Sequence, residues 1–119
     1  MMKIKILFAI VLLFSTVANA KDIDLSNNPA MMALYDNFLP AFYKSAEQTL
    51  VQNGFQESKA KNYVSALKKR IKKQDLINET YPCLSKVAIG DMETKGVQCL
   101  LPWMTKVQEK NADLMRLLR

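Results

Sequence analysis

Apolar residues recur three or four positions apart along most of the chain, and nowhere do apolar and polar residues alternate for long. Spacing of three and four places side chains on one face of a helix, whereas alternation is the pattern of a half-buried strand. The sequence therefore predicts an all-α fold. We expect a small single-domain bundle of about four helices, one pair of which is joined by a disulfide.

The first helix is expected to begin after Asn28, whose side chain is a good N-cap, with Pro29 in the first turn. A proline is tolerated there because its missing N–H would have no helical partner. Gly54 predicts a left-handed end to this helix. Pro40 lies inside it, so we expect a kink there or two helices that meet at Leu39.

Residues 59–73, with the sequence KAKNYVSALKKRIKK, contain seven basic side chains and no acidic one. On a helix that begins near Ser58, the apolar residues fall within an arc of about 100° and the basic residues occupy the rest. The apolar stripe consists of Tyr63, Val64, Leu67 and Ile71. We call the other side the basic helix face; its predicted binding residues are Lys61, Lys68, Lys69, Arg70, Lys72 and Lys73.

A third helix is expected from a cap at Asp75 to about Leu84, with a break at Ile89–Asp91. A last helix is expected from about Glu93 towards Leu118. Its apolar residues again repeat in steps of three and four, although Pro102 predicts a kink or a restart.

Cys83 and Cys99 each lie eight residues from Asp91, in the middle of the predicted turn. In an antiparallel helix pair, residues equidistant from the turn lie at matching heights, so a disulfide would join the two helices. Closing a loop of fifteen residues stabilises the fold by about 3 kcal/mol. A redox-active pair is the alternative, but it would more naturally use C-x-x-C spacing.

The first twenty residues have the three parts of a secretory signal peptide. A positive start is followed by the apolar stretch Ile6–Phe14, which is too short to span a bilayer, and by a small-residue cleavage site. We expect cleavage between Ala20 and Lys21 and a periplasmic or secreted protein. A flexible arm over 21–28 and a helical domain over 29–119 would remain.

Removing Lys3 and Lys5 with the signal peptide lowers the net charge from +6 to +4. The chain has no histidine, which excludes Ser–His and Cys–His nucleophile pairs and most zinc sites. Its three glycines are too scattered for a phosphate-binding loop, and its acidic residues form no pair suited to acid–base chemistry. We therefore expect no enzyme, no catalytic residue, no metal and no cofactor.

The basic helix face favours a binding protein that docks on an acidic surface of another protein. A solvated face without a partner is the alternative, since helices often expose lysine. An anionic membrane or cell-wall surface is another candidate, but membrane binding would require the apolar stripe to be free for lipid. Nucleic acid is disfavoured, because no aromatic residues alternate with the lysines to stack bases.

Asn111 occupies an apolar position of the last helix, where a buried amide needs a hydrogen-bond partner. In dimeric coiled coils such an asparagine pairs with its symmetry mate. We favour an amide that is exposed or satisfied within the chain, because the apolar seam is short. A homodimer is kept as an alternative, since the final turns are rich in apolar residues that could pair with a second copy.

In its expected architecture, a small exported helical domain with one disulfide, the chain is similar to two kinds of periplasmic protein. These are the acid-stress chaperones and the immunity proteins that block delivered toxins. The likeness concerns architecture and specifies no residue. A chaperone role would require the domain to open and expose Phe38, Phe42 and Trp103.

Overall fold

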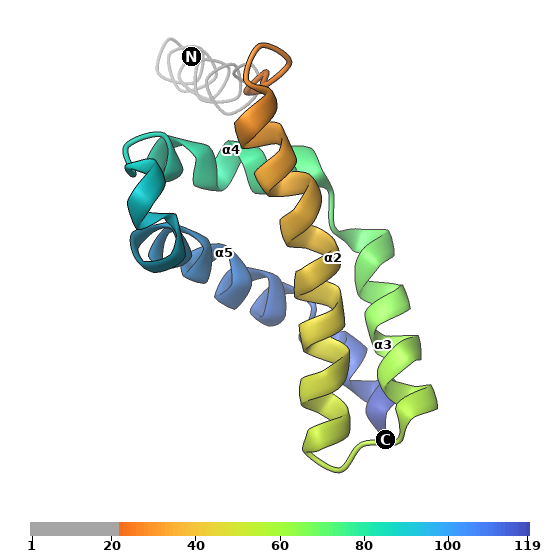
Figure 1. Cartoon of the computed structure of the whole chain (residues 1–119). Coiled ribbons are helices and arrows are strands. Elements are labelled where there is room, and N and C mark those ends of the chain that lie inside the picture. The colour runs from red at the N-terminus through yellow and green to blue at the C-terminus, as the bar shows by residue number, and fades with distance from the viewer. Residues whose placement is uncertain (1–21) are drawn as a thin grey trace, which may run out of the picture.

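The computed structural model of the protein describes residues 22–119, which are all-helical and contain no strand (Figure 1). The predicted all-α class is confirmed. The four α-helices of this region are α2 (Pro29–Gln52), α3 (Glu57–Arg70), α4 (Lys73–Leu84) and α5 (Val97–Lys110). Shorter 3-10 and π segments complete it: η1 (Ile89–Asp91), η2 (Met92–Gly96) and η3 (Ala112–Leu118). The predicted signal peptide, 1–20, lies outside the described residues.

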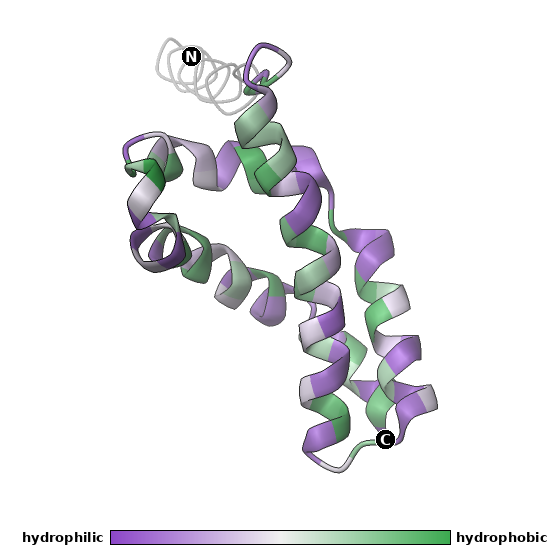
Figure 2. Ribbon diagram, in the orientation of Figure 1, coloured by the Kyte–Doolittle hydropathy of each residue, from purple (hydrophilic) through white to green (hydrophobic). Residues whose placement is uncertain are grey.

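The helices form two pairs (Figure 1). Helix α3 returns beside α2 in the opposite direction, and η3 packs against α3 near the end of the chain. Helix α5 returns beside α4 after the turn made by η1 and η2. Apolar and polar residues recur in turn along the helices, as the green and purple bands of Figure 2 show. The apolar sides meet in one core, because only there are they removed from water.

Both ends of α2 follow the prediction. The Oδ1 atom of Asn28 accepts a hydrogen bond from the backbone N–H of Met31 at 3.2 Å. At the other end Gly54 has a φ of 94°, and its N–H and that of Phe55 donate to carbonyls of the last turn. The left-handed region is open to glycine because it has no Cβ, and these two bonds satisfy carbonyls that the helix leaves free.

Of the two alternatives predicted at Pro40, a kink or two helices that meet at Leu39, the second is wrong, because α2 continues through Pro40 as one helix. Pro40 has no N–H to donate to the carbonyl of Asp36, four residues earlier. Both residues are exposed, and water can therefore hydrate the freed carbonyl without loss of buried hydrogen bonding.

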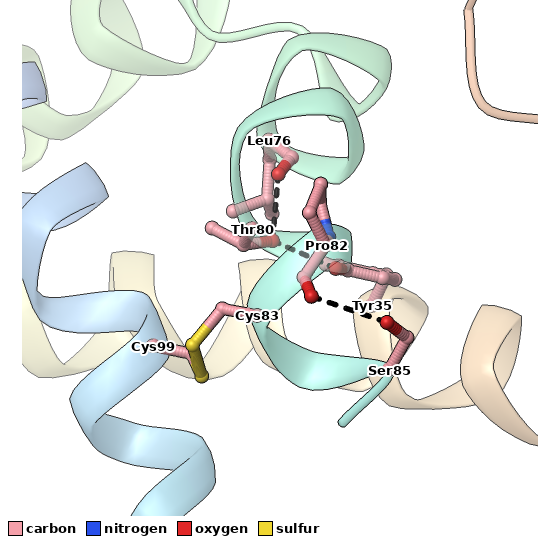
Figure 3. The surroundings of a disulfide bond; sticks show 7 residues. All are labelled: Tyr35, Leu76, Thr80, Pro82, Cys83, Ser85 and Cys99. Atoms are coloured by element: carbon pink, nitrogen blue, oxygen red, sulfur yellow. Dashed lines mark hydrogen bonds between the residues drawn. A yellow bond between two sulfur atoms is a disulfide. The ribbon is translucent and has the colours of Figure 1, made fainter. Parts of the chain in front are cut away.

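The predicted disulfide is confirmed. Cys83 on α4 and Cys99 on α5 are bonded, and their Cα atoms are 5.7 Å apart (Figure 3). On the side of α4 that faces α2, the Tyr35 and Thr80 hydroxyl oxygens lie 2.7 Å apart. Helix α4 is thus tied covalently to α5 and by a buried polar contact to α2.

Helix α3 ends earlier than predicted. It stops at Arg70, Ile71 and Lys72 are extended, and Lys73 begins α4. The prediction that one helix carries all of residues 59–73 is therefore wrong. The sequence gives no sign of this turn, because it contains neither glycine nor proline. The change of direction allows α4 to bury Leu76 and Ile77 in the core.

The predicted cap at Asp75 is also wrong, because this residue lies in the first turn of α4 and Lys72 occupies the cap position.

The last predicted helix, from Glu93 to Leu118, is three segments. Residues Met92–Gly96 form the wider π turn, α5 ends at Lys110, and Ala112–Leu118 continue as a 3-10 helix. Asn111 is the C-cap of α5, and both its backbone N–H and its side-chain Nδ2 donate to the carbonyl of Val107, at 3.1 and 2.8 Å. The side chain is buried and satisfied within the chain, which confirms the favoured interpretation of this residue.

The segment that the sequence predicts as a flexible arm lies against α4 over its described residues. Leu25 is buried in the core. The N–H of Ile23 donates to Asn78 at 2.9 Å, and its carbonyl accepts from Gln74 at 2.8 Å. These contacts cover one side of α4.

Candidate functional site

The residues predicted for the basic helix face divide into two groups. Lys61 lies in the first half of α3 and Lys68 in its last turn, and neither lines the groove described below. Lys61 pairs with Glu57, one turn earlier, at 3.2 Å, and the ammonium of Lys68 lies 5.3 Å from the ring centroid of Tyr43. The second group, Lys69 to Lys73, gathers where α3 ends and α4 begins.

Arg70 is an interhelical contact residue. Its guanidinium donates two hydrogen bonds to the Asp113 carboxylate, at 2.8 and 2.9 Å, and a longer one to the Asn111 side chain at 3.3 Å. The hydrogen bonds from Arg70 lower the pKa of Asp113, and the same bonds raise the pKa of Arg70. Arg70 therefore joins the end of α3 to the start of η3.

Lys73 is similarly occupied. Its ammonium lies 2.8 Å from the Asp36 carboxylate and ties the start of α4 to α2. Two of the predicted binding residues, Arg70 and Lys73, thus form exposed ion pairs between elements and are less available to a partner than the sequence alone suggests.

A groove of about 460 Å³ opens beside this cluster. We call it the basic groove. It is lined by Lys69, Arg70, Ile71, Lys72, Asp75, Glu79, Trp103, Lys106, Val107, Lys110 and Asn111. Five of these side chains are cationic and two are acidic, so the positive charge dominates.

The cations of the basic groove differ in their partners. Arg70 is bonded to Asp113, and Lys106 lies 3.1 Å from Glu79. Lys69, Lys72 and Lys110 form no ion pair within residues 22–119. We call these three the free lysines.

The apolar part of the groove is formed by Trp103, Val107 and Ile71. Trp103 is 4% exposed, and its ring meets those of Phe38 and Phe42 edge-on, with centroids 5.9 and 5.3 Å apart. Such contacts fix the position of the indole. The three aromatic residues that a chaperone would have to expose therefore pack together between α2 and α5.

Four groove residues on α5 were not predicted as part of the basic site, although Trp103 was considered for a chaperone role; they are Trp103, Lys106, Val107 and Lys110. Their spacing of three and four places all four on neighbouring positions of one helix, which a helical wheel could have shown. No local pattern could have indicated that this face meets the end of α3.

The basic surface continues on the other side of Lys69 and Arg70. A second hollow between α3 and η3 includes both residues, together with Arg116 and the apolar Leu114 and Leu117. This hollow contains no acidic side chain. Lys69 and Arg70 thus have positively charged hollows on both sides.

The apolar stripe of α3 is not open to lipid. Tyr63, Val64 and Leu67 are each no more than 8% exposed. The basic side chains of α3 must therefore act without the insertion of this stripe into a bilayer. In the part of the chain that the structure describes, no helix combines the length and the apolar character needed to cross a membrane.

The site combines positive charge with a shaped groove. Among residues 22–119, no three acidic or cysteine side chains come together as a metal site would require. Comparison with models of protein families, with curated proteins and with solved structures finds no match for this chain. Any function must therefore be argued from the basic groove and its surroundings.

Proposed function

We propose that the protein is an exported, non-catalytic binding protein that docks its basic groove on an acidic surface of another protein. One observation carries the proposal: three lysines without ion-pair partners converge on a groove with a rigid, partly aromatic interior. Charges that stay unpaired in the folded chain can bind a partner without breaking the fold.

The charge arrangement supports a protein partner over a bare anionic surface. Lysines at the groove come from the end of α3, from the following linker and from α5, so their positions are set by tertiary packing. A folded or ordered acidic partner can match such fixed positions, and complementary charges speed association and favour the right partner. Membrane binding would gain less, because the α3 stripe is buried.

Export is supported by the leader pattern and by the disulfide. Disulfides form and persist mainly in oxidising compartments, and Cys83 and Cys99 are joined. The proposal of a non-catalytic role rests on the absence of histidine from the chain and on the groove's composition.

The test compares two variants with the same change in net charge. Lys69→Glu/Lys110→Glu reverses free lysines of the groove, whereas Lys44→Glu/Lys86→Glu reverses exposed lysines elsewhere. Immobilised protein is exposed to the envelope fraction of its own cells, and bound proteins are eluted with salt. We expect the wild type and the Lys44/Lys86 variant to retain the same acidic proteins and the groove variant to lose them.

Two outcomes would contradict the proposal. The groove variant could retain the same proteins at the same salt concentration, which would mean that the groove is not the contact. Alternatively, only anionic lipid vesicles or cell-wall material could bind, which would favour the surface-binding alternative. Circular dichroism of both variants establishes that the comparison is between folded proteins.

A further inference from the structure

We infer that the basic groove recognises a short acidic segment of its partner that carries an apolar side chain between its carboxylates, and that this side chain rests on Trp103. The inference rests on the proposed function and specifies the chemistry of the partner.

The free lysines require negative charge at separate points. Lys69 and Lys72 belong to the end of α3 and the linker after it, whereas Lys110 belongs to α5. Trp103 and Val107 share α5 with Lys110 and form the buried part of the same groove. A ligand that reaches both sets of lysines must therefore cross apolar surface.

The acidic lining disfavours a ligand of uniformly dense negative charge. Asp75 lines the groove and forms no ion pair within residues 22–119, and Glu79 is already paired with Lys106. A polyphosphate or a nucleic acid would bring its charges against Asp75 as well as against the lysines. A peptide carries its charges at intervals and offers backbone N–H donors, so it can avoid this repulsion.

Trp103 forms part of the floor of the groove: it is 4% exposed, so a ligand side chain would contact only its accessible edge, together with Val107 and Ile71. Tryptophan in a fixed position, surrounded by groups that exclude water, is a typical residue of binding hot spots. Here Phe38 and Phe42 hold the indole edge-on, so little freedom is lost when a ligand covers it.

The groove has a suitable size for one side chain and its flanking backbone. Its volume of about 460 Å³ lies within the range of about 300–1,000 Å³ that small-ligand sites occupy. The groove can therefore seat a short segment, while the rest of the partner contacts the surrounding basic surface.

Trp103 is the only tryptophan of the chain, so its fluorescence reports occupancy of the groove directly. The probe is a blocked peptide with four glutamates around a central phenylalanine. The controls replace the phenylalanine with alanine, or the glutamates with lysines. Titrations are made with the wild type, with Lys69→Glu/Lys110→Glu and with Lys44→Glu/Lys86→Glu.

We expect the phenylalanine peptide to change the emission of Trp103 and to bind about tenfold more tightly than the alanine peptide, because an aromatic side chain leaves water. The lysine peptide should not bind. Reversal of Lys69 and Lys110 should abolish the emission change, whereas the Lys44/Lys86 variant should keep it.

The outcomes separate this inference from the proposed function. If both acidic peptides bind equally and the emission of Trp103 does not change, the apolar contact is wrong while acidic docking stands. If neither peptide binds, or if the Lys69/Lys110 variant binds them as well as the wild type does, acidic docking at this groove is wrong. Equal binding of the lysine peptide would likewise reject the role of charge.

Discussion

The buried contact between Tyr35 and Thr80 allows a quantitative test of what joins the two helix pairs. Tyr35 is fully buried and Thr80 is 1% exposed, and their hydroxyl oxygens are 2.7 Å apart. The Thr80 hydroxyl also lies 2.7 Å from the carbonyl of Leu76 and donates to it. Because a threonine has only one hydroxyl proton, the Tyr35 hydroxyl must donate to Thr80.

This direction predicts unequal effects for the two single substitutions. Thr80→Val keeps the shape of the side chain but leaves the Tyr35 O–H buried without an acceptor, which costs about 1–3 kcal/mol. Tyr35→Phe removes the donor itself, and Thr80 keeps its bond to Leu76. The loss is then one net hydrogen bond, about 1 kcal/mol.

The double variant Tyr35→Phe/Thr80→Val should be more stable than Thr80→Val alone, because it no longer contains an unsatisfied hydroxyl. The free energy of unfolding is measured by urea titration, with Trp103 fluorescence and circular dichroism as independent probes. If Thr80→Val is no more destabilising than Tyr35→Phe, or if the effects of the two substitutions simply add, the assigned direction of the hydrogen bond is refuted.

Two further predictions concern the other cross-links. Cys83→Ala/Cys99→Ala should lower the free energy of unfolding, measured by urea titration, by about 3 kcal/mol, while the helical circular dichroism signal stays the same. An unchanged urea midpoint would mean that the disulfide does not stabilise the fold. Arg70 lowers the pKa of Asp113, so their pair contributes its full stability above about pH 3.8 and loses it as the pH falls through the lowered pKa. Asp113→Asn should therefore make the urea midpoint less dependent on pH in the acid range. Part of the dependence should remain, because the pKa of Asp24 is also lowered. If the variant and the wild type show identical acid profiles, the pair does not contribute to stability.

The helical class and several helix ends could be predicted because they depend on local chemistry. Asn28 caps α2 with its own side chain, and Gly54 ends the helix by a conformation that few other residues adopt. The pairing of Cys83 with Cys99 was also predictable, since both lie at equal distance from a recognisable turn. None of these inferences required knowledge of what each helix packs against.

The basic site was only partly predictable. Lys69 and Lys72 were identified as binding residues, and the structure places both at the groove. Arg70 and Lys73 were assigned the same role, but their carboxylate partners lie 43 and 37 residues away in sequence. Whether a cation is free or paired depends on such distant residues, which a local pattern does not contain.

Local preferences in the amino-acid sequence were sufficient for the type of structure, the start and the end of α2, and an excess of positive charge at the end of α3. Tertiary packing decided where α3 stops, which lysines stay unpaired, and that Trp103 and Lys110 of α5 join them. The physical reason is the distance in sequence over which interactions act: caps and helical periodicity depend on residues within one or two turns of each other. A groove, in contrast, forms only when the burial of Leu76, Ile77 and their neighbours brings separate helices together.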